Sequence, residues 1–272
     1  MLTLSKNYPI LVDDEAKSQT LKFWSSDSKE SYSKNFKSGW EYENSEDLVY
    51  EFNEWGYRTK NIDDLDKDFA LVFGCSYTEG VGLYQKDIWC EKLCKELGID
   101  VFNLAKQGSG PDISYMNTML YVKNLIKHKP RLVIYQWPQI FRKTFTYTNG
   151  SNNSNLSLNL TNHNINTDVS NEDSNWYKNR WLKEDGEMYK DSFFNFYSTD
   201  ILWKALDVPV YHWTWSGDFT NKYDKPFGFI EDDKIRVIKN KSNDKARDNG
   251  HDGKQIHSDV VDFLIDDIRK LL

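Results

Sequence analysis

The chain is poor in the features that mark several large classes of protein. It has only three cysteines, Cys75, Cys90 and Cys94, and this odd number excludes a disulfide framework and favours a reducing compartment. No stretch approaches the roughly 20 apolar residues of a membrane span, and the first residues do not form a secretion signal. We therefore expect a cytoplasmic protein with no membrane partner. Its richness in Asn and Lys is compatible with a bacterial or phage genome.

Positive charge is also in deficit. The 272 residues carry 35 basic and 42 acidic side chains, a formal net charge of −7. This balance argues against a nucleic-acid partner held by bulk charge. The mean hydropathy of −0.74 alone suits a disordered chain, but 15% aromatic residues, including 10 Trp, indicate a globular protein with an aromatic-rich core.

Short apolar runs alternate with helical patterns along the chain. Runs of strand length occupy 69–74, 100–104, 131–137, 208–215 and 235–239, and helical patterns occupy 88–98, 113–126, 190–206 and 256–271. The strands are nearly continuous in apolar character, which is typical of a parallel sheet covered on both faces. The pattern predicts a mostly parallel five-stranded sheet in a doubly wound three-layer α/β/α sandwich.

We expect one domain over 67–272, preceded by a lead-in. Residues 1–66 are polar and weakly periodic, which predicts an irregular N-terminal lead-in packed on the domain. Residues 149–175 are rich in Asn and Ser, and such a composition predicts a solvated insertion. The alternation in 156–166 leaves an exposed hairpin open as an alternative.

The segment GCSYTEGVG, at 74–82, directly follows the first predicted strand. Ligands of open parallel sheets bind beyond the carboxyl ends of the strands, so Ser76 lies where a hydroxyl can face a cleft, with its own amide beside it. A phosphate loop is disfavoured, because there is no Gly-Lys-Ser/Thr and the glycine spacing misses the dinucleotide pattern. The alternative is an ordinary turn serine.

A second candidate pair lies just before the last helix. Asp248 precedes His251 by three residues, a spacing at which a carboxylate on one loop can reach Nδ1 and leave Nε2 free as a base. The alternative is a capping aspartate beside a surface histidine. Gly108, after the second strand, can supply a backbone N–H to the same cleft. His257 is expected to pack or cap, and the remaining histidines have no partner at metal-ligand spacing, so we predict no metal site.

Three motifs together resemble the SGNH (GDSL-type) hydrolases. They are GCSYTEGVG at 74–82, NLAKQGSG at 103–110 and DNGHDGKQIH at 248–257, in the order of the family. The resemblance implies a flavodoxin-like fold, no metal or organic cofactor, and hydrolysis of an ester through an acyl-enzyme. It assigns Ser76 as nucleophile, His251 as general base, Asp248 as its partner, and the amides of Ser76 and Gly108 as oxyanion donors.

The sequence departs from this family after the third strand. A Gly-x-Asn-Asp segment is expected there, but the chain reads VIYQWPQIFR at 133–142. Gln139, or less favourably Gln136, can offer a side-chain amide to the oxyanion instead, and Arg142 can bind an anionic group. Trp137 can stack on a sugar ring, although core packing is the alternative role.

These features favour a serine esterase that removes acetyl or another short acyl group from a carbohydrate or small metabolite. Two alternatives stay open. The missing third motif and the Asn/Ser-rich insertion suit a catalytically weak module that binds glycans or serves in a phage particle. The same serine chemistry also suits an acyltransferase. The sequence fixes neither the substrate nor the oligomeric state.

Overall fold

The computed structural model describes most of the chain. The described residues are 2–4, 8–38, 41–42, 44, 47–148, 154–160, 187–215, 235–238 and 243–272. Most of the predicted insertion, 149–153 and 161–175, lies outside them. The remainder of the insertion, Ser154–Leu160, forms strand β9.

A five-stranded sheet forms the centre of the domain. Its strands are β5 (Phe69–Phe73), β6 (Asp100–Asn103), β7 (Leu132–Trp137), β10 (Val210–Thr214) and β11 (Arg236–Val237). They lie in the order β11-β10-β7-β5-β6, and every neighbouring pair is parallel. Numbered along the chain, this is the order 2-1-3-4-5 of flavodoxin-like folds. The predicted fold class is therefore confirmed.

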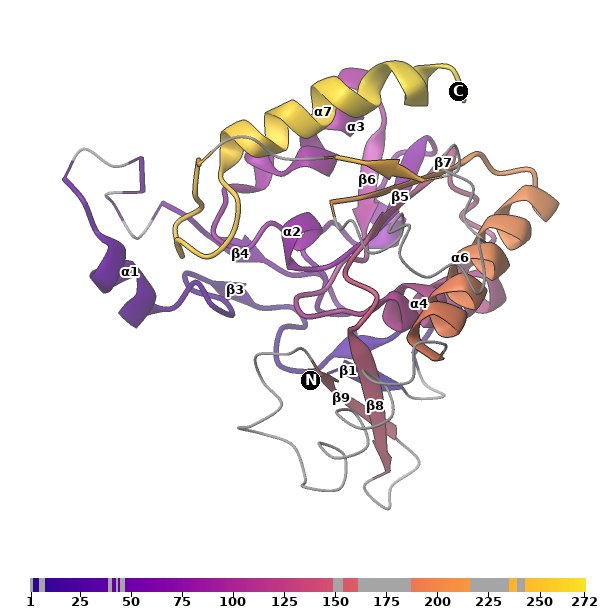
Figure 1. Ribbon diagram of the computed structural model, residues 1–272, viewed down its shortest axis with the longest axis horizontal. Coiled ribbons are helices and arrows are strands. Elements are labelled where there is room, and N and C mark those ends of the chain that lie inside the picture. The colour runs from indigo at the N-terminus through magenta and orange to yellow at the C-terminus, as the bar shows by residue number, and fades with distance from the viewer. Residues whose placement is uncertain are drawn as a thin grey trace.

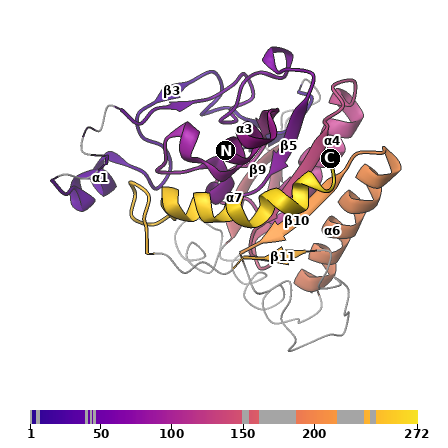
Figure 2. The same ribbon diagram turned by 90° about the horizontal axis from the view of Figure 1, so that it is seen from above.

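Helices cover both faces of this sheet (Figures 1 and 2). Helices α3 (Trp89–Leu97) and α7 (Lys254–Arg269) lie on one face, and α4 (Pro111–Leu125) and α6 (Glu187–Ala205) on the other. Strand residues alternate between the two cores, because successive side chains of a strand point to opposite faces. Ala70 and Val72 pack with α3 and α7, whereas Leu71 and Phe73 pack with α4 and α6.

The N-terminal region contains short elements that periodicity could not reveal. They are β1 (Leu2–Leu4), β2 (Val12–Asp13), β3 (Thr20–Leu21), α1 (Lys29–Asn35), β4 (Tyr50–Glu51) and the 3₁₀ turn η1 (Ile62–Asp64). A second 3₁₀ turn, η2 (Gln85–Asp87), precedes α3. Strands β1 and β2 join β9 and β8 (Lys143–Thr148) in an antiparallel sheet of order β2-β1-β9-β8. Strands of two or three residues carry too little alternation for a sequence signal.

Buried charges attach the N-terminal region to the domain. Arg247 and Asp27 are both fully buried and form an ion pair at 2.7 Å between Nη2 and Oδ2. The Arg247 Nε–H donates to both carboxylate oxygens of Asp27, at 2.9 and 3.0 Å. A second buried cation, Lys106, lies 2.8 Å from Asp13 and 3.3 Å from Glu79. The Asp27–Arg247 and Asp13–Lys106 pairs each join a residue of the first 66 to a loop at the carboxyl end of the sheet.

Of the helices among the described residues, none is both long enough and apolar enough to cross a membrane.

The Asp27–Arg247 pair predicts a large effect of a small substitution. Asp27→Asn leaves the guanidinium buried without its carboxylate, and such a change typically costs about 3–5 kcal/mol of folding free energy. Urea denaturation would measure the loss. The matched control is Asp68→Asn, which breaks an exposed ion pair to Arg131 and should cost less than about 1 kcal/mol. Equal, small losses in both variants would contradict a stabilising role for the buried pair.

Candidate active site

Ser76 stands at the first position of a four-residue helix that follows the first strand of the five-stranded sheet. The helix α2 (Ser76–Glu79) follows β5 after Gly74 and Cys75. A Cβ added at Gly74 would lie 2.4 Å from the Thr78 hydroxyl, so only glycine allows the turn to close this tightly. Ser76 itself is half-buried. Its hydroxyl is therefore held at the carboxyl end of the sheet by a turn with little freedom.

Gln136, at the end of β7, holds that turn in place. Its Oε1 accepts the Cys75 N–H at 3.2 Å and the Thr78 hydroxyl at 3.1 Å. Its Nε2 donates to the Trp137 carbonyl at 3.0 Å. Because the side chain is 1% exposed and its Oε1 and Nε2 are both hydrogen-bonded, Gln136 supports the Ser76 turn from behind and is not placed to offer its amide to a ligand.

Three side chains form a continuous hydrogen-bonded chain. The Nε2 atom of His251 lies 2.8 Å from the Ser76 hydroxyl oxygen, and its Nδ1 lies 2.6 Å from Oδ2 of Asp248. A carboxylate accepts, so Nδ1 carries the proton and Nε2 of the neutral ring accepts from Ser76. The Asp248 side chain is fully buried, and that of His251 is 23% exposed. The structure therefore brings together the three residues that the sequence singles out.

Asp248 is surrounded by donors. Its Oδ1 accepts the backbone N–H of Gly250 at 3.1 Å and that of His251 at 3.0 Å, and its Oδ2 also accepts the Ser26 hydroxyl at 2.7 Å. Burial alone would raise the pKa of this carboxyl, but the hydrogen bonds from His251 and Ser26 and the electrostatic interaction with the imidazole ring outweigh it and lower the pKa to about 2. Asp248 is thus an anion at all ordinary pH values.

Close approach of two backbones brings the histidine loop to the serine turn. Gly82 has φ +78°, and a Cβ there would lie 2.8 Å from the Cβ of Ala246 and 3.0 Å from the amide nitrogen of Arg247. The Arg247 N–H donates to the Gly82 carbonyl at 3.0 Å. A side chain at residue 82 would push the loop of Asp248 away from the turn of Ser76.

The loop after β6 brings Gly108 to the same end of the sheet. The Lys106 N–H donates to the Gly74 carbonyl at 3.2 Å, and the Gln107 N–H donates to the buried Glu79 carboxylate at 2.7 Å. Gly108 has φ +70°, which glycine adopts without strain. Within the described ranges, no hydrogen bond uses the amide of Gly108 or that of Ser76. These two N–H groups are therefore available to a ligand.

The remaining residues singled out after the third strand do not all face a ligand. Trp137 is fully buried in the core, with its Nε1–H donated to His212 at 3.1 Å, so core packing accounts for it and its ring has no free face for a sugar. Gln139 is half-buried, and no side chain or backbone group in the described part of the chain bonds to its Oε1. Arg142 is also half-buried and donates from Nη1 to the Ser109 carbonyl at 3.4 Å.

Ser26 and Glu79 are the site residues that sequence reasoning missed. Ser26 lies 222 positions from Asp248 in a polar segment, so no local pattern points to it. Glu79 lies inside the 74–82 motif, and a carboxylate on a short helix between two glycines was a usable signal, because such a charge needs a partner once it is buried. Its partners, Lys106 and the Trp24 Nε1–H at 3.1 Å, come from distant segments.

His257 packs and caps as expected. It is 1% exposed, its ring stacks on Tyr77 with centroids 4.3 Å apart, and its Nδ1 accepts the Trp89 N–H at the start of α3 at 3.0 Å. Burial, with the charges of Lys92 and His251, lowers its pKa to about 3. The imidazole is therefore neutral in the folded protein and serves as an acceptor.

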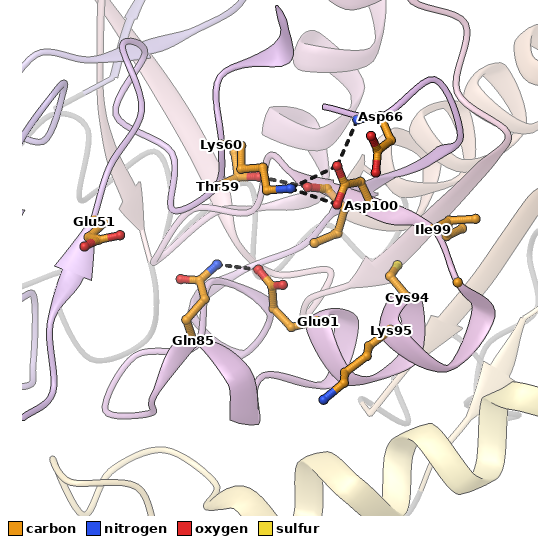
Figure 3. Close-up of a pocket in the computed structure, with 12 residues that line it drawn as sticks. Glu51, Thr59, Lys60, Asp66, Gln85, Glu91, Cys94, Lys95, Ile99 and Asp100 are labelled. Atoms are coloured by element: carbon orange, nitrogen blue, oxygen red, sulfur yellow. Dashed lines mark hydrogen bonds and ion pairs between the residues drawn. The ribbon is translucent and has the colours of Figure 1, made fainter. Parts of the chain in front are cut away.

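A separate pocket of about 530 Å³ lies at the amino end of β6, away from the carboxyl ends of the strands (Figure 3). It borders Asp100, the first residue of β6, whereas Ser76 follows the last residue of the parallel strand β5. Two of its carboxylates are engaged: Asp100 with Lys60 at 3.0 Å, and Glu91 with Gln85. No group of three or more metal-ligating side chains gathers here or elsewhere in the described part of the chain. Ser76, Asp248 and His251 do not line this pocket.

Comparison with known proteins finds similarity among solved structures. No protein-family model and no curated protein matches the chain. The chain is similar to the esterase EstA from Pseudoalteromonas sp., with a TM-score of 0.44 and 13% identity over 75% of this chain and 98% of that one. It is similar to the acetyl xylan esterase Est2A from Butyrivibrio proteoclasticus, with a TM-score of 0.41 and 13% identity over 75% and 63%.

A third similar structure comes from Desulfitobacterium hafniense and is assigned to the G-D-S-L family of lipolytic proteins. Its TM-score is 0.31, with 13% identity over 75% of this chain and 99% of that one.

The buried His257 predicts a loss of stability in acid. Its pKa is about 3 in the folded chain and 6.5 for the free side chain, so below pH 6.5 the unfolded chain takes up a proton that the folded chain does not. Stability therefore falls as pH falls from 6.5 toward 3, by about 2 kcal/mol between pH 7 and pH 5 from this group.

Urea denaturation at the two pH values tests this. His257→Asn keeps an acceptor for the Trp89 N–H but does not titrate. Its loss of folding free energy between pH 7 and pH 5 should therefore be smaller than that of the wild type by about 2 kcal/mol. His128→Asn, at a histidine whose side chain is 26% exposed, controls for removal of a histidine as such. An unchanged pH dependence in His257→Asn would show that the buried ring is protonated in the native state.

Proposed function

We propose that the protein is a serine esterase that works through an acyl-enzyme. The observation that carries the proposal is the continuous chain from the buried Asp248 carboxylate through His251 to the Ser76 hydroxyl, with contacts of 2.6 and 2.8 Å. This arrangement gives a hydroxyl a base, and gives the base a fixed tautomer, which is what nucleophilic attack on an ester carbonyl requires.

In the first half of the reaction, Ser76 Oγ attacks the carbonyl carbon of the ester while its proton passes to His251 Nε2. The imidazolium that forms is stabilised by the Asp248 anion at Nδ1. His251 then returns the proton to the leaving alkoxide oxygen as the ester bond breaks, leaving the acyl group on Ser76. In the second half, His251 takes a proton from water, whose oxygen attacks the acyl carbon. His251 then returns that proton to Ser76 Oγ as the bond between Oγ and the acyl group breaks and the acid leaves.

The negative oxygen of each tetrahedral intermediate needs donors that are in place beforehand. The free amides of Ser76 and Gly108 fill this role in the proposal, because the Gln136 bonds and the Lys106–Glu79 pair fix their loops. Gln139 is proposed as a third, side-chain donor through its Nε2 amino group, because it is half-buried and lies two residues beyond the end of β7. Arg142 is proposed to bind an anionic part of the substrate.

The resemblance to SGNH hydrolases extends the proposal to the substrate. It suggests a short acyl group, such as acetyl, on a carbohydrate or another small alcohol. Release of acetate from acetylated xylan and acetylated monosaccharides would test the alcohol part of the substrate. Hydrolysis rates for p-nitrophenyl esters of increasing acyl chain length would test the acyl part. A preference for long acyl chains would contradict it.

The first expected outcome concerns the nucleophile and needs no known substrate. A fluorophosphonate should add once to the wild type and not to Ser76→Ala, because only an activated serine displaces fluoride. Intact-mass spectrometry measures the adduct. Ser109→Ala is the control, since Ser109 is fully buried and should leave labelling unchanged. If folded wild type takes no adduct, the esterase proposal fails, and glycan binding becomes the function to test.

The second outcome concerns the carboxylate. Asp248→Asn keeps an Oδ1 acceptor for the loop amides but loses the charge that holds Nδ1–H, so kcat for p-nitrophenyl acetate should fall by about 10⁴-fold. Asp244→Asn provides a nearby comparison, because its carboxylate bonds to the N–H of Gln255 and not to His251. A fall of less than tenfold in Asp248→Asn would contradict the relay.

A further inference from the structure

One contact of the Asp248 carboxylate has no part in the mechanism above: the hydrogen bond from Ser26. It comes from the N-terminal region, and it ends on Oδ2, the same oxygen that receives the His251 Nδ1–H. We propose that Ser26 is a positioning residue for the Asp248–His251 pair, and that the turn 24–27 is a built part of the active site. This proposal rests on the proposed esterase function.

The carboxylate depends on Ser26 for its orientation. Its Oδ1 is fixed by two loop amides, whereas among the described residues its Oδ2 is bonded by the Ser26 hydroxyl, at 2.7 Å, and by the His251 ring. The Asp248 side chain is fully buried while Ser26 is exposed, so the hydroxyl lies on the solvent side of the carboxylate, where a water molecule would otherwise stand. A hydroxyl held by the protein fixes the carboxylate plane, whereas exchanging water would not.

The turn that carries Ser26 is itself held in an uncommon conformation. Trp24 and Asp27 exchange both backbone hydrogen bonds, at 3.0 and 3.1 Å, around a two-residue turn. Ser25 in this turn has φ +60°, which a non-glycine residue rarely adopts. Such strain persists where the surroundings determine the backbone, and it gathers at functional sites. Here the Trp24 indole bonds to the buried Glu79, and Asp27 pairs with Arg247.

Two adjacent residues of the 24–27 turn contact two adjacent residues of the loop that carries His251. Asp27 binds Arg247 in the buried ion pair, and the next residues, Ser26 and Asp248, make the hydrogen bond. The ion pair therefore sets the distance at which the hydroxyl meets the carboxylate.

Helix α1 holds the backbone of the same aspartate. Ser31 Oγ and Asn35 Nδ2 each donate to the Asp248 carbonyl at 3.1 Å. Both the side chain and the main chain of Asp248 are thus held by residues 26–35. A segment that only packed on the domain would not need three polar side chains, those of Ser26, Ser31 and Asn35, to bond to the same residue, Asp248.

The test compares two side chains of the same shape at residue 26. Ser26→Thr keeps the hydroxyl, and Ser26→Val replaces it with a methyl group that also keeps water away. With p-nitrophenyl acetate, Ser26→Val should lower kcat by about 3- to 10-fold and leave KM within about twofold of the wild type, because the lost hydrogen bond acts through Asp248 and not on the substrate. Ser26→Thr should keep kcat within about twofold of the wild type. Ser33→Ala, whose hydroxyl bonds to its own helix, should leave both constants unchanged.

The outcomes separate this proposal from the function beneath it. Equal kcat values in Ser26→Val and Ser26→Thr, or a fall in kcat that accompanies a lowered melting temperature in both variants, would overturn the positioning role. The esterase proposal would still stand in that case, provided that Ser76 of the wild type is labelled by the fluorophosphonate. Absence of labelling in the wild type would overturn both. If Ser26→Val does not fold, Ser26→Ala takes its place. A folded Ser26→Ala protein with the kcat of the wild type would also overturn the positioning role.

Discussion

The buried ion pair between Arg247 and Asp27 sets where the histidine loop lies. Both side chains are fully buried, so neither charge tolerates the loss of the other. The Tyr50 hydroxyl links the pair to the serine turn, since it donates to Asp27 at 2.5 Å and accepts the Gly82 N–H at 2.7 Å. One electrostatic interaction thus fixes three segments relative to one another: the N-terminal region, the turn of Ser76 and the loop of His251.

The other half of the site depends on a second buried cluster. Lys106 joins Asp13 and Glu79, and its ammonium group also lies 4.6 Å from the centre of the Trp24 ring. Glu79 ends the serine helix and accepts the N–H of the residue before Gly108. The two backbone amides proposed for the oxyanion therefore share one buried support. Polar networks of this kind are stable only when nearly every member is paired, and they then specify a single arrangement.

The fold and the central relay could be predicted because their signals are local. Apolar runs such as 69–74 and 131–137 have strand length, and the distinctive Ser76 turn and the Asp248–His251 pair each lie within a few residues. The supporting residues could not be predicted in the same way. Ser26 and Asp27 act on residues more than 200 positions away, and Gln136 acts on a turn about 60 positions earlier. Trp137 was ambiguous for another reason: a tryptophan at a strand end suits either a core or a cleft, and only burial distinguishes them.

The separation between Ser26 and Asp248 also bears on when the site can form. The hydrogen bonds that complete it span 175, 220 and 222 residues: the first joins Ser76 to His251, and the other two join the first tenth of the chain to the last tenth. Contacts of such long range form late, because closing the intervening loop costs entropy before the contact returns any stability. During synthesis the serine turn and the sheet around it emerge long before residue 251. The nascent chain therefore carries Ser76 without His251, and the contact between them forms only once the last part of the chain has folded against the sheet.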